Sequence, residues 1–250
     1  MKQSPLYDDL INTLPDGLVR QVSVGVLWTT VVVEVEGRLQ GGLAATLQNP
    51  EYEHTRTPLV KQPGRLTHLP ARELAGLAAS ESHTEASIGL AAINALLPRN
   101  PERYLEREAS DWLIEQGAGK NVAMIGHFHF IEELRAQVQN LWVLELDPRP
   151  GDFHASEAPR ILPQADVVAI TATTLINHTF EALMRLCRPD ARVMILGPST
   201  PLAPVLFDHG VEVLAGTLVE DPIRTAEMAA QGGTSRQFKP FCRQVFLQKA

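Results

Sequence analysis

Large apolar residues recur along this chain with two different periods. From Val22 to Trp28 every second residue is valine or tryptophan, which is the period of a β-strand with one buried face. At Ile131, Leu134 and Val138 the spacing is three and four, which is the period of a helix. The first part of the chain places strands before helices, whereas the second part alternates them. The pattern therefore predicts two parts with different architectures.

Residues 1–103 are predicted to form a small α+β domain. Ser82 and Glu85 have the spacing of a capping box, in which each side chain satisfies the other's backbone N–H at the start of a helix. The expected elements are a helix at 6–14, an antiparallel pair of strands at 22–28 and 31–35, a turn at Gly41-Gly42, an irregular stretch at 48–69, and helices at 71–79 and 84–97.

Residues 104–250 are predicted to form a Rossmann-like domain. Alternation of short buried strands with helices is typical of a doubly wound, mainly parallel sheet with right-handed crossovers. The whole chain is therefore expected to be an α/β protein in which a small α+β domain precedes this sheet. The expected elements are a helix at 104–116, parallel strands at 122–125, 141–146, 167–171, 193–196 and 211–215, and an added strand at 244–248.

Composition narrows the function classes. The chain has 250 residues, a formal net charge of −7 and no dense patch of Lys and Arg, so nucleic acid is not an expected partner. No apolar run reaches the roughly 18 residues of a membrane span, and acidic residues stand where a signal peptide would be apolar. We therefore expect a cytoplasmic protein with no membrane partner, and a homo-oligomer is compatible with this composition. Cys187 and Cys242 have no CxxC spacing, which argues against a zinc or disulfide framework.

Small hydroxyl and amide residues follow two of the predicted parallel strands. In open α/β sheets, ligands bind beyond the carboxyl ends of the strands, and helix N-termini there favour anions. Helix capping explains one hydroxyl at each turn, whereas two adjacent hydroxyls at both turns favour ligand contact. The candidate binding residues are Thr173, Thr174 and Asn177 in the first cluster, and Gly197, Ser199 and Thr200 in the second.

The first βα turn, Gly126–Ile131, lacks the glycine-rich fingerprint of dinucleotide-binding proteins. The missing glycines would let pyrophosphate approach the backbone and let helix and strand pack closely. Glu145 does end the next predicted strand about 20 residues later, where a ribose-binding carboxylate would stand. A dinucleotide would therefore need a non-standard loop, and Gly126, His127 and Glu145 remain candidate binding residues.

His127 and His129 are separated by one residue, a spacing that points both imidazoles to the same side of an extended chain. Glu145 ends the neighbouring strand, so a carboxylate can converge with them. Histidine and carboxylate ligands suit zinc, iron or nickel. We therefore treat His127, His129 and Glu145 as candidate metal ligands, with a transition metal ion or a metal chelate as the implied cofactor. The alternative is a loop of solvated or hydrogen-bonded histidines, with Glu145 capping a helix.

Asn94 interrupts the run of small and apolar residues at 88–97. A buried asparagine needs hydrogen-bond partners, either backbone groups, which is the commoner case, or a ligand between the two domains. Asn94 is therefore the candidate binding residue of the first domain.

Four segments carry a resemblance to a known family: 87–95, 145–148, 165–177 with Thr-Thr-Leu-Ile-Asn, and 196–202 with Gly-Pro-Ser-Thr-Pro. They resemble the hallmark segments of the heavy-metal chelation family of uncharacterised bacterial and archaeal proteins. The resemblance spans nearly the whole chain and implies an enolase N-terminal-like domain, a Rossmann-like domain, a site in the cleft between them, and a role in handling metals or metal complexes. It also implies that Gly126-x-Phe is a shared feature whereas His129 is not.

Two hypotheses follow, both with a small-molecule or metal ligand as the partner. In the first, the protein binds a heavy metal or a metal chelate in the interdomain cleft, with His127, His129 and Glu145 on the metal and the hydroxyl clusters on the chelator. In the second, it is an enzyme that acts on a small anionic metabolite or nucleotide-type ligand in the same cleft, with His127 or Glu145 as general acid or base. No G-x-S-x-G, H-E-x-x-H or P-loop motif is present to define a reaction.

Overall fold

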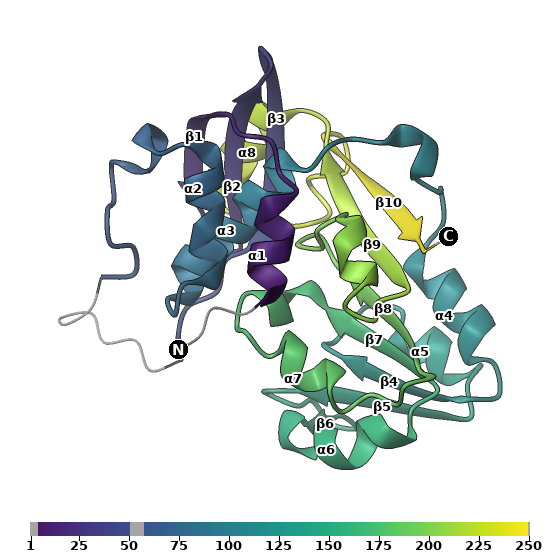
Figure 1. The fold of residues 1–250 in the computed structure, drawn as a ribbon. Coiled ribbons are helices and arrows are strands. Elements are labelled where there is room, and N and C mark those ends of the chain that lie inside the picture. The colour runs from purple at the N-terminus through teal and green to yellow at the C-terminus, as the bar shows by residue number, and fades with distance from the viewer. Residues whose placement is uncertain (1–4, 51–57, 250) are drawn as a thin grey trace.

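The computed structural model describes residues 5–50 and 58–249 of the chain (Figure 1). Within these residues ten strands form one continuous sheet, in the order β1-β2-β3-β9-β8-β7-β4-β5-β6, and β10 pairs with β9. None of the helices within these two ranges combines the length and the apolar character that a membrane span requires. The two parts of the chain therefore share a single sheet, joined through β9.

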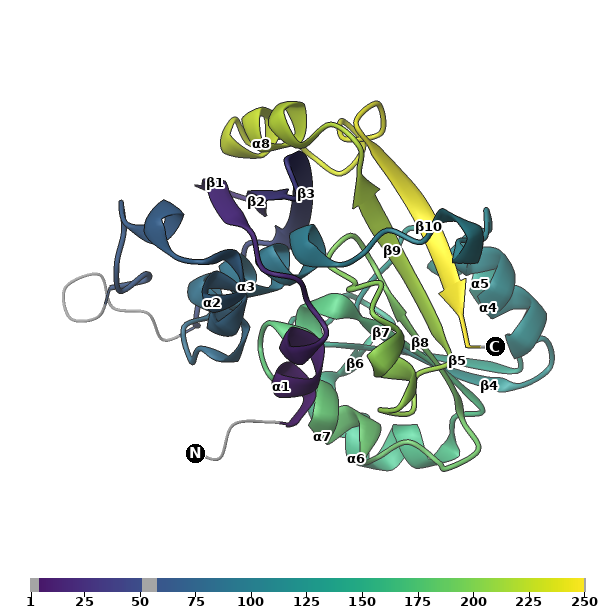
Figure 2. The same cartoon turned by 45° about the horizontal axis from the view of Figure 1, so that its top comes forward.

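The N-terminal part is an antiparallel three-stranded meander covered by helices on both faces. Figure 2 shows β1–β3 between α3 on one side and α8, a helix from the second part of the chain, on the other. Its own elements are α1 (Pro5–Asn12), β1 (Leu18–Val24), β2 (Trp28–Val35), β3 (Arg38–Ala45), η1 (Leu66–His68), α2 (Ala71–Ala75), η2 (Gly76–Ala79), α3 (His83–Leu96) and η3 (Pro101–Arg103).

The turn expected at Gly41-Gly42 is wrong, because both glycines lie inside β3. They serve close packing instead of chain reversal. A Cβ atom added to Gly42 would lie 1.9 Å from the carbonyl oxygen of Ala91 in α3, and one added to Gly41 would lie 2.7 Å from a side-chain carbon of Val219 in β9. The chain reverses earlier, at Glu36-Gly37, where both residues have positive φ.

The C-terminal part confirms the predicted doubly wound sheet, with parallel pairing among β4–β9 and an antiparallel final strand. Its elements are α4 (Ala109–Gly117), β4 (Asn121–Ile125), α5 (Ile131–Arg135), β5 (Asn140–Glu145), β6 (Phe153–His154), η4 (Ala155–Glu157), α6 (Ala158–Ile161), η5 (Leu162–Gln164), β7 (Val167–Thr171), η6 (Ala172–Leu175), α7 (Phe180–Met184), β8 (Arg192–Leu196), η7 (Pro204–Phe207), β9 (Val213–Val219), α8 (Pro222–Ala230) and β10 (Cys242–Gln248).

One predicted helix start and one predicted helix cap differ from the structure. The helix expected from Tyr104 begins only at Ala109, because Leu105 makes a backbone bridge to Phe246 in β10 and is held extended. The capping box of α3 forms only in half. The Ser82 hydroxyl accepts the backbone N–H of Glu85, but the Glu85 carboxylate bonds to other groups.

The apolar core runs through both parts. One cluster contains Leu10 and Ile93 of the N-terminal part together with Ile125, Ile170 and Phe180 of the parallel sheet and its helices. A second cluster packs α4 and α5 on the opposite face of that sheet. The domain boundary expected between residues 103 and 104 stays a prediction. Contacts extend across it, because α8 packs on the first three strands and the core contains residues of both parts.

We expect Gly42→Ala to destabilise the fold, because its methyl group has no space against the backbone of α3. A loss of about 1–3 kcal/mol in the free energy of unfolding, measured in urea, is the scale for an overpacked core site. Gly76→Ala is the matched control. Gly76 has helical φ and open space around its Cβ position, so alanine there should be neutral or stabilise by up to about 1 kcal/mol. Equal stability of the two variants would contradict the packing role of Gly42.

Candidate functional site

The sheet forks at β9, and a loop fills the fork. β9 pairs with β8 through residues 213–215 and with β3 only at Val219. The loop at 197–201 lies in the gap, where the Ser199 hydroxyl accepts the backbone N–H of Ala45 at 2.8 Å. A Cβ on Gly216 would lie 2.8 Å from the carbonyl oxygen of Thr200. Ser199 therefore replaces the strand partner that the edge of β3 lacks at this position.

Asn94 of α3 joins the same loop to β3. Its amide nitrogen donates to the carbonyl oxygens of Leu43, at 2.9 Å, and Ser199, at 3.1 Å. The structure therefore brings together Asn94, Ser199 and Thr200, and the backbone partners expected for a buried asparagine are present.

Two buried polar atoms at this junction, Oδ1 of Asn94 and Oγ1 of Thr200, have no hydrogen-bond partner among the residues that the structure describes. Both residues line a crevice together with Gly41, Tyr104 and Thr217. Its volume is about 10 Å³, near the least that one water molecule needs. This crevice is suited to a water-sized group and is too small for an organic ligand.

The threonine cluster forms a tight turn after β7. The Thr171 hydroxyl accepts the N–H of Thr173 and contacts the Thr173 hydroxyl at 3.0 Å, and the Thr174 hydroxyl donates to the Thr171 carbonyl at 2.7 Å. The Asn177 side-chain oxygen accepts two bonds from Thr179. Capping therefore engages each of these groups locally, and their role toward a ligand stays a prediction.

The switch point of the sheet lies between β4 and β7. The strands that follow β4, β5 and β6, lie on one side of it, and the strands that follow β7, β8 and β9, lie on the other. Gly126 follows β4 with φ +101°, and a Cβ there would lie 3.0 Å from the Cβ of Thr171. The end of β7 therefore approaches the turn after β4 so closely that a side chain at residue 126 would crowd Thr171. This is the place where open α/β sheets bind ligands.

His127, which follows Gly126, pairs with a residue that the sequence reasoning missed. Its Nδ1 lies 3.1 Å from Oδ2 of Asp152, whose side chain is 3% exposed, against 24% for His127. Asp152 precedes β6, and β6 pairs with the end of β5. Twenty-five residues separate the two partners, so no local sequence signal connected them.

The predicted metal ligands do not gather into a three-residue site. Within residues 5–50 and 58–249, no group of three or more His, Cys, Asp or Glu side chains is arranged to hold a metal ion. His129 is exposed and lies edge-on to Phe130, and Glu145 ends β5 opposite His154 of β6. The described side chains of this chain therefore do not fit a bare metal ion bound by protein ligands alone, although His127 or Glu145 can still contribute single ligands.

Neither cysteine offers a thiolate. Burial raises the pKa of Cys187 to about 11 and also raises the pKa of Cys242. The thiolate is the form that binds soft metals, so both side chains are weak ligands near neutral pH.

The N-terminal part is fastened to the threonine turn by hydrogen bonds. The Tyr7 hydroxyl of α1 donates to the Leu175 carbonyl at 2.6 Å and lies 2.9 Å from Nδ1 of His178, whose Nε2 lies 2.8 Å from the Ser80 carbonyl oxygen. Burial and the charge of Glu181 raise the pKa of Tyr7, which keeps its hydroxyl protonated. His178, with φ +59°, is a contact between the two parts and not a helix residue.

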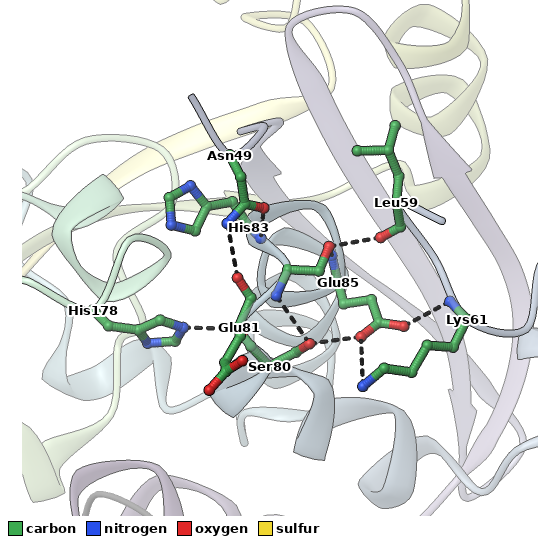
Figure 3. A network of polar contacts seen from close by, with 9 residues as sticks. Asn49, Leu59, Lys61, Ser80, Glu81, His83, Glu85 and His178 are labelled. Carbon is green, nitrogen blue, oxygen red and sulfur yellow. Dashed lines mark hydrogen bonds and ion pairs between the residues drawn. The ribbon is translucent and has the colours of Figure 1, made fainter. Parts of the chain in front are cut away.

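Figure 3 shows how this contact continues into the start of α3. Ser80 donates its hydroxyl hydrogen to the Glu85 carboxylate at 2.6 Å, and the backbone N–H of Lys61 donates to the same carboxylate at 2.8 Å. The Glu85 side chain is 2% exposed. A buried charge is stable only when it is hydrogen-bonded and paired, so this network fixes Ser80 where His178 binds it.

A larger groove lies elsewhere, on the side of β9 and β10. Its volume is about 680 Å³, and it is bordered by Arg107, Lys239, Arg243, Glu220 and Cys242 among others. None of the predicted site residues lines it. Its cationic and anionic side chains are mixed, so it favours no one class of ligand.

The architecture is that of an α/β protein whose small helix-covered meander joins a Rossmann-like sheet, with a candidate site at the switch point. Residues 108–248 match the family model DUF364, and residues 7–97 match a second model, DUF4213; both are described as "Putative heavy-metal chelation". The chain belongs to the DUF364 family.

Known relatives agree with this membership. A crystal structure of a DUF364 protein of unknown function from Desulfitobacterium hafniense is 31% identical, with a TM-score of 0.83 over 99% of each chain. Another, from Pyrococcus horikoshii, has a TM-score of 0.83 over 100% of each chain at 21% identity, which shows the fold alone. An uncharacterised protein of Methanocaldococcus jannaschii is 24% identical over 217 residues, 82% of this chain and 80% of that protein.

Ser199→Ala should lower the free energy of unfolding by about 1–3 kcal/mol, because the N–H of Ala45 then loses its partner at a partly buried junction. Urea unfolding measures this, with Ser235→Ala as the control, since Ser235 is exposed. An unchanged unfolding midpoint for Ser199→Ala would show that its hydroxyl is not a structural group.

Cys187 should react slowly with iodoacetamide at pH 8, because its raised pKa leaves little thiolate. We expect the folded protein to modify at this residue many times more slowly than the protein in urea, as followed by mass spectrometry of the peptide. Equal rates in the two states would contradict the burial of this thiol.

Proposed function

We propose that the protein binds a small, oxygen-rich anionic ligand, in particular a metal already held by an organic chelator, at the carboxyl edge of β4 and β7. The observation that carries the proposal is the close approach of the turn at Gly126 to Thr171 at the switch point of the sheet. Ligands of open α/β sheets bind at this position, and the bonds from Tyr7 and Ser80 hold the N-terminal part beside it.

The threonine turn retains hydrogen-bonding capacity for such a ligand. The hydroxyls of Thr171 and Thr173 carry one hydrogen each, and their mutual contact uses only one of the two. The other hydrogen can be donated to a ligand oxygen. Uncharged donors of this kind recognise carboxylate oxygens without requiring a buried positive charge.

The chelator supplies most of the metal's ligands in this proposal. The described residues offer no three-ligand group, and both thiols are held protonated. A metal that arrives chelated needs few ligands from the protein. The proposal also agrees with the description of the family model that the chain matches.

A second candidate is an enzyme that acts on a small anionic metabolite at the same edge. The pairing of His127 with the buried Asp152 favours it, because a carboxylate-bound imidazole is a common general base. Turnover of a candidate metabolite that is lost in His127→Ala would select this function over simple binding.

Calorimetric titration and thermal unfolding with citrate, nickel–EDTA and nickel chloride test the binding proposal. We expect citrate or nickel–EDTA to bind and to raise the unfolding temperature, as any ligand that prefers the folded state does. Thr173→Val should weaken that binding by about two- to tenfold, the scale of one hydrogen bond. Thr67→Val, at an exposed position of η1, should have no effect. Stoichiometric binding of nickel chloride with no response to citrate or nickel–EDTA would overturn the proposal.

A further inference from the structure

His127 and Asp152 are arranged as a histidine fixed for coordination. The two side chains come from different loops at the same edge of the sheet, one after β4 and one before β6. Oδ2 of Asp152 lies 3.1 Å from Nδ1 of His127 and also accepts the backbone N–H of Arg149 at 3.2 Å. The aspartate is therefore itself held in place by the backbone.

This arrangement defines which nitrogen of the neutral ring is available. A carboxylate can only accept a hydrogen bond, so Nδ1 carries the hydrogen and Nε2 carries the lone pair. Nε2 has no hydrogen-bond partner in the part of the chain that the structure describes. Metal-binding histidines are held in the same way, with the nitrogen opposite the metal bound to a carboxylate that fixes the ring and increases its basicity.

We propose that Nε2 of His127 coordinates the metal of a chelate that has an open coordination position, and that Asp152 positions the ring. This inference rests on the proposed function, because the chelator provides the other ligands. A single imidazole does not retain a bare ion, and no group of three ligand side chains surrounds His127 within the described ranges. The site therefore selects chelates with an open position over fully coordinated chelates and over free metal.

Nickel–nitrilotriacetate and nickel–EDTA separate the two claims. Nitrilotriacetate leaves positions open on nickel, whereas EDTA occupies them, and both present carboxylates. We expect the nitrilotriacetate complex to bind wild-type protein at least about tenfold more tightly than the EDTA complex in calorimetric titrations. His127→Ala should remove this difference. Asp152→Asn should reduce the affinity for the nitrilotriacetate complex by about 10- to 100-fold, the usual effect of losing the carboxylate behind a metal-binding histidine.

Two neighbouring histidines provide matched controls. His129 and His154 are both exposed, so they report what a surface imidazole without a buried carboxylate behind it contributes. His129→Ala and His154→Ala should leave the affinity unchanged. Loss of binding in either control, with retention in His127→Ala, would show surface binding only and would overturn the inference.

Electron paramagnetic resonance of copper(II)–nitrilotriacetate gives a direct readout. The spectrum with wild-type protein should show nitrogen coupling from one imidazole, and His127→Ala should lose it while the variant still unfolds in a cooperative transition. If nickel–EDTA and citrate bind but His127→Ala changes neither spectrum nor affinity, the inference fails and the proposed function stands. If the nitrilotriacetate complex binds through His127 while citrate and nickel–EDTA do not bind, the proposed recognition of oxygen-rich anions by the threonine turn fails and only the histidine site stands.

Discussion

One loop fills the fork where β9 pairs with β8 at one end and with β3 at the other, and it ties the edge of β3 to the parallel strands. Ser199 satisfies the N–H of Ala45, and Asn94 joins the loop to β3 through two carbonyl oxygens. Without these bonds the edge of β3 would present unpaired backbone groups at a partly buried junction, which costs free energy comparable to that of the lost hydrogen bonds. The position of the N-terminal part relative to the parallel strands depends on this loop.

The candidate site inherits its geometry from that junction. The two parts share a core and a sheet, so their relative position is fixed. The hydrogen bonds of Tyr7 with Leu175 and of His178 with Ser80 then hold the turn after β7 against the N-terminal part. The edge of β4 and β7 therefore combines a rigid threonine turn with a fixed imidazole at His127. Rigid placement lowers the entropy that a bound ligand would otherwise have to offset.

Much of the fold is predictable from sequence, because short apolar runs separated by helical patterns specify parallel strands locally. Five of the six parallel strands and the final strand follow from such runs, and most of α3 follows from its capping residue and its run of small and apolar residues. Close packing between distant segments has no local signal in the sequence. Gly41-Gly42 therefore resembled a turn, although the two residues lie inside β3 and pack against β9 and α3. In the site, the positions of Gly126 and the threonine cluster at strand ends follow from topology. The partner of His127 does not, because Asp152 reaches it only through the pairing of β6 with β5.

The packing of α8 on the first three strands has a consequence for how the chain is made. Gly25 of the meander lies against the backbone of Ala229, and the cluster of Trp28, Leu43 and Phe238 is completed from the far end of the chain. The ribosome synthesises β1–β3 early and α8 late. One apolar face of the nascent meander therefore stays exposed to solvent until most of the Rossmann-like sheet has been synthesised.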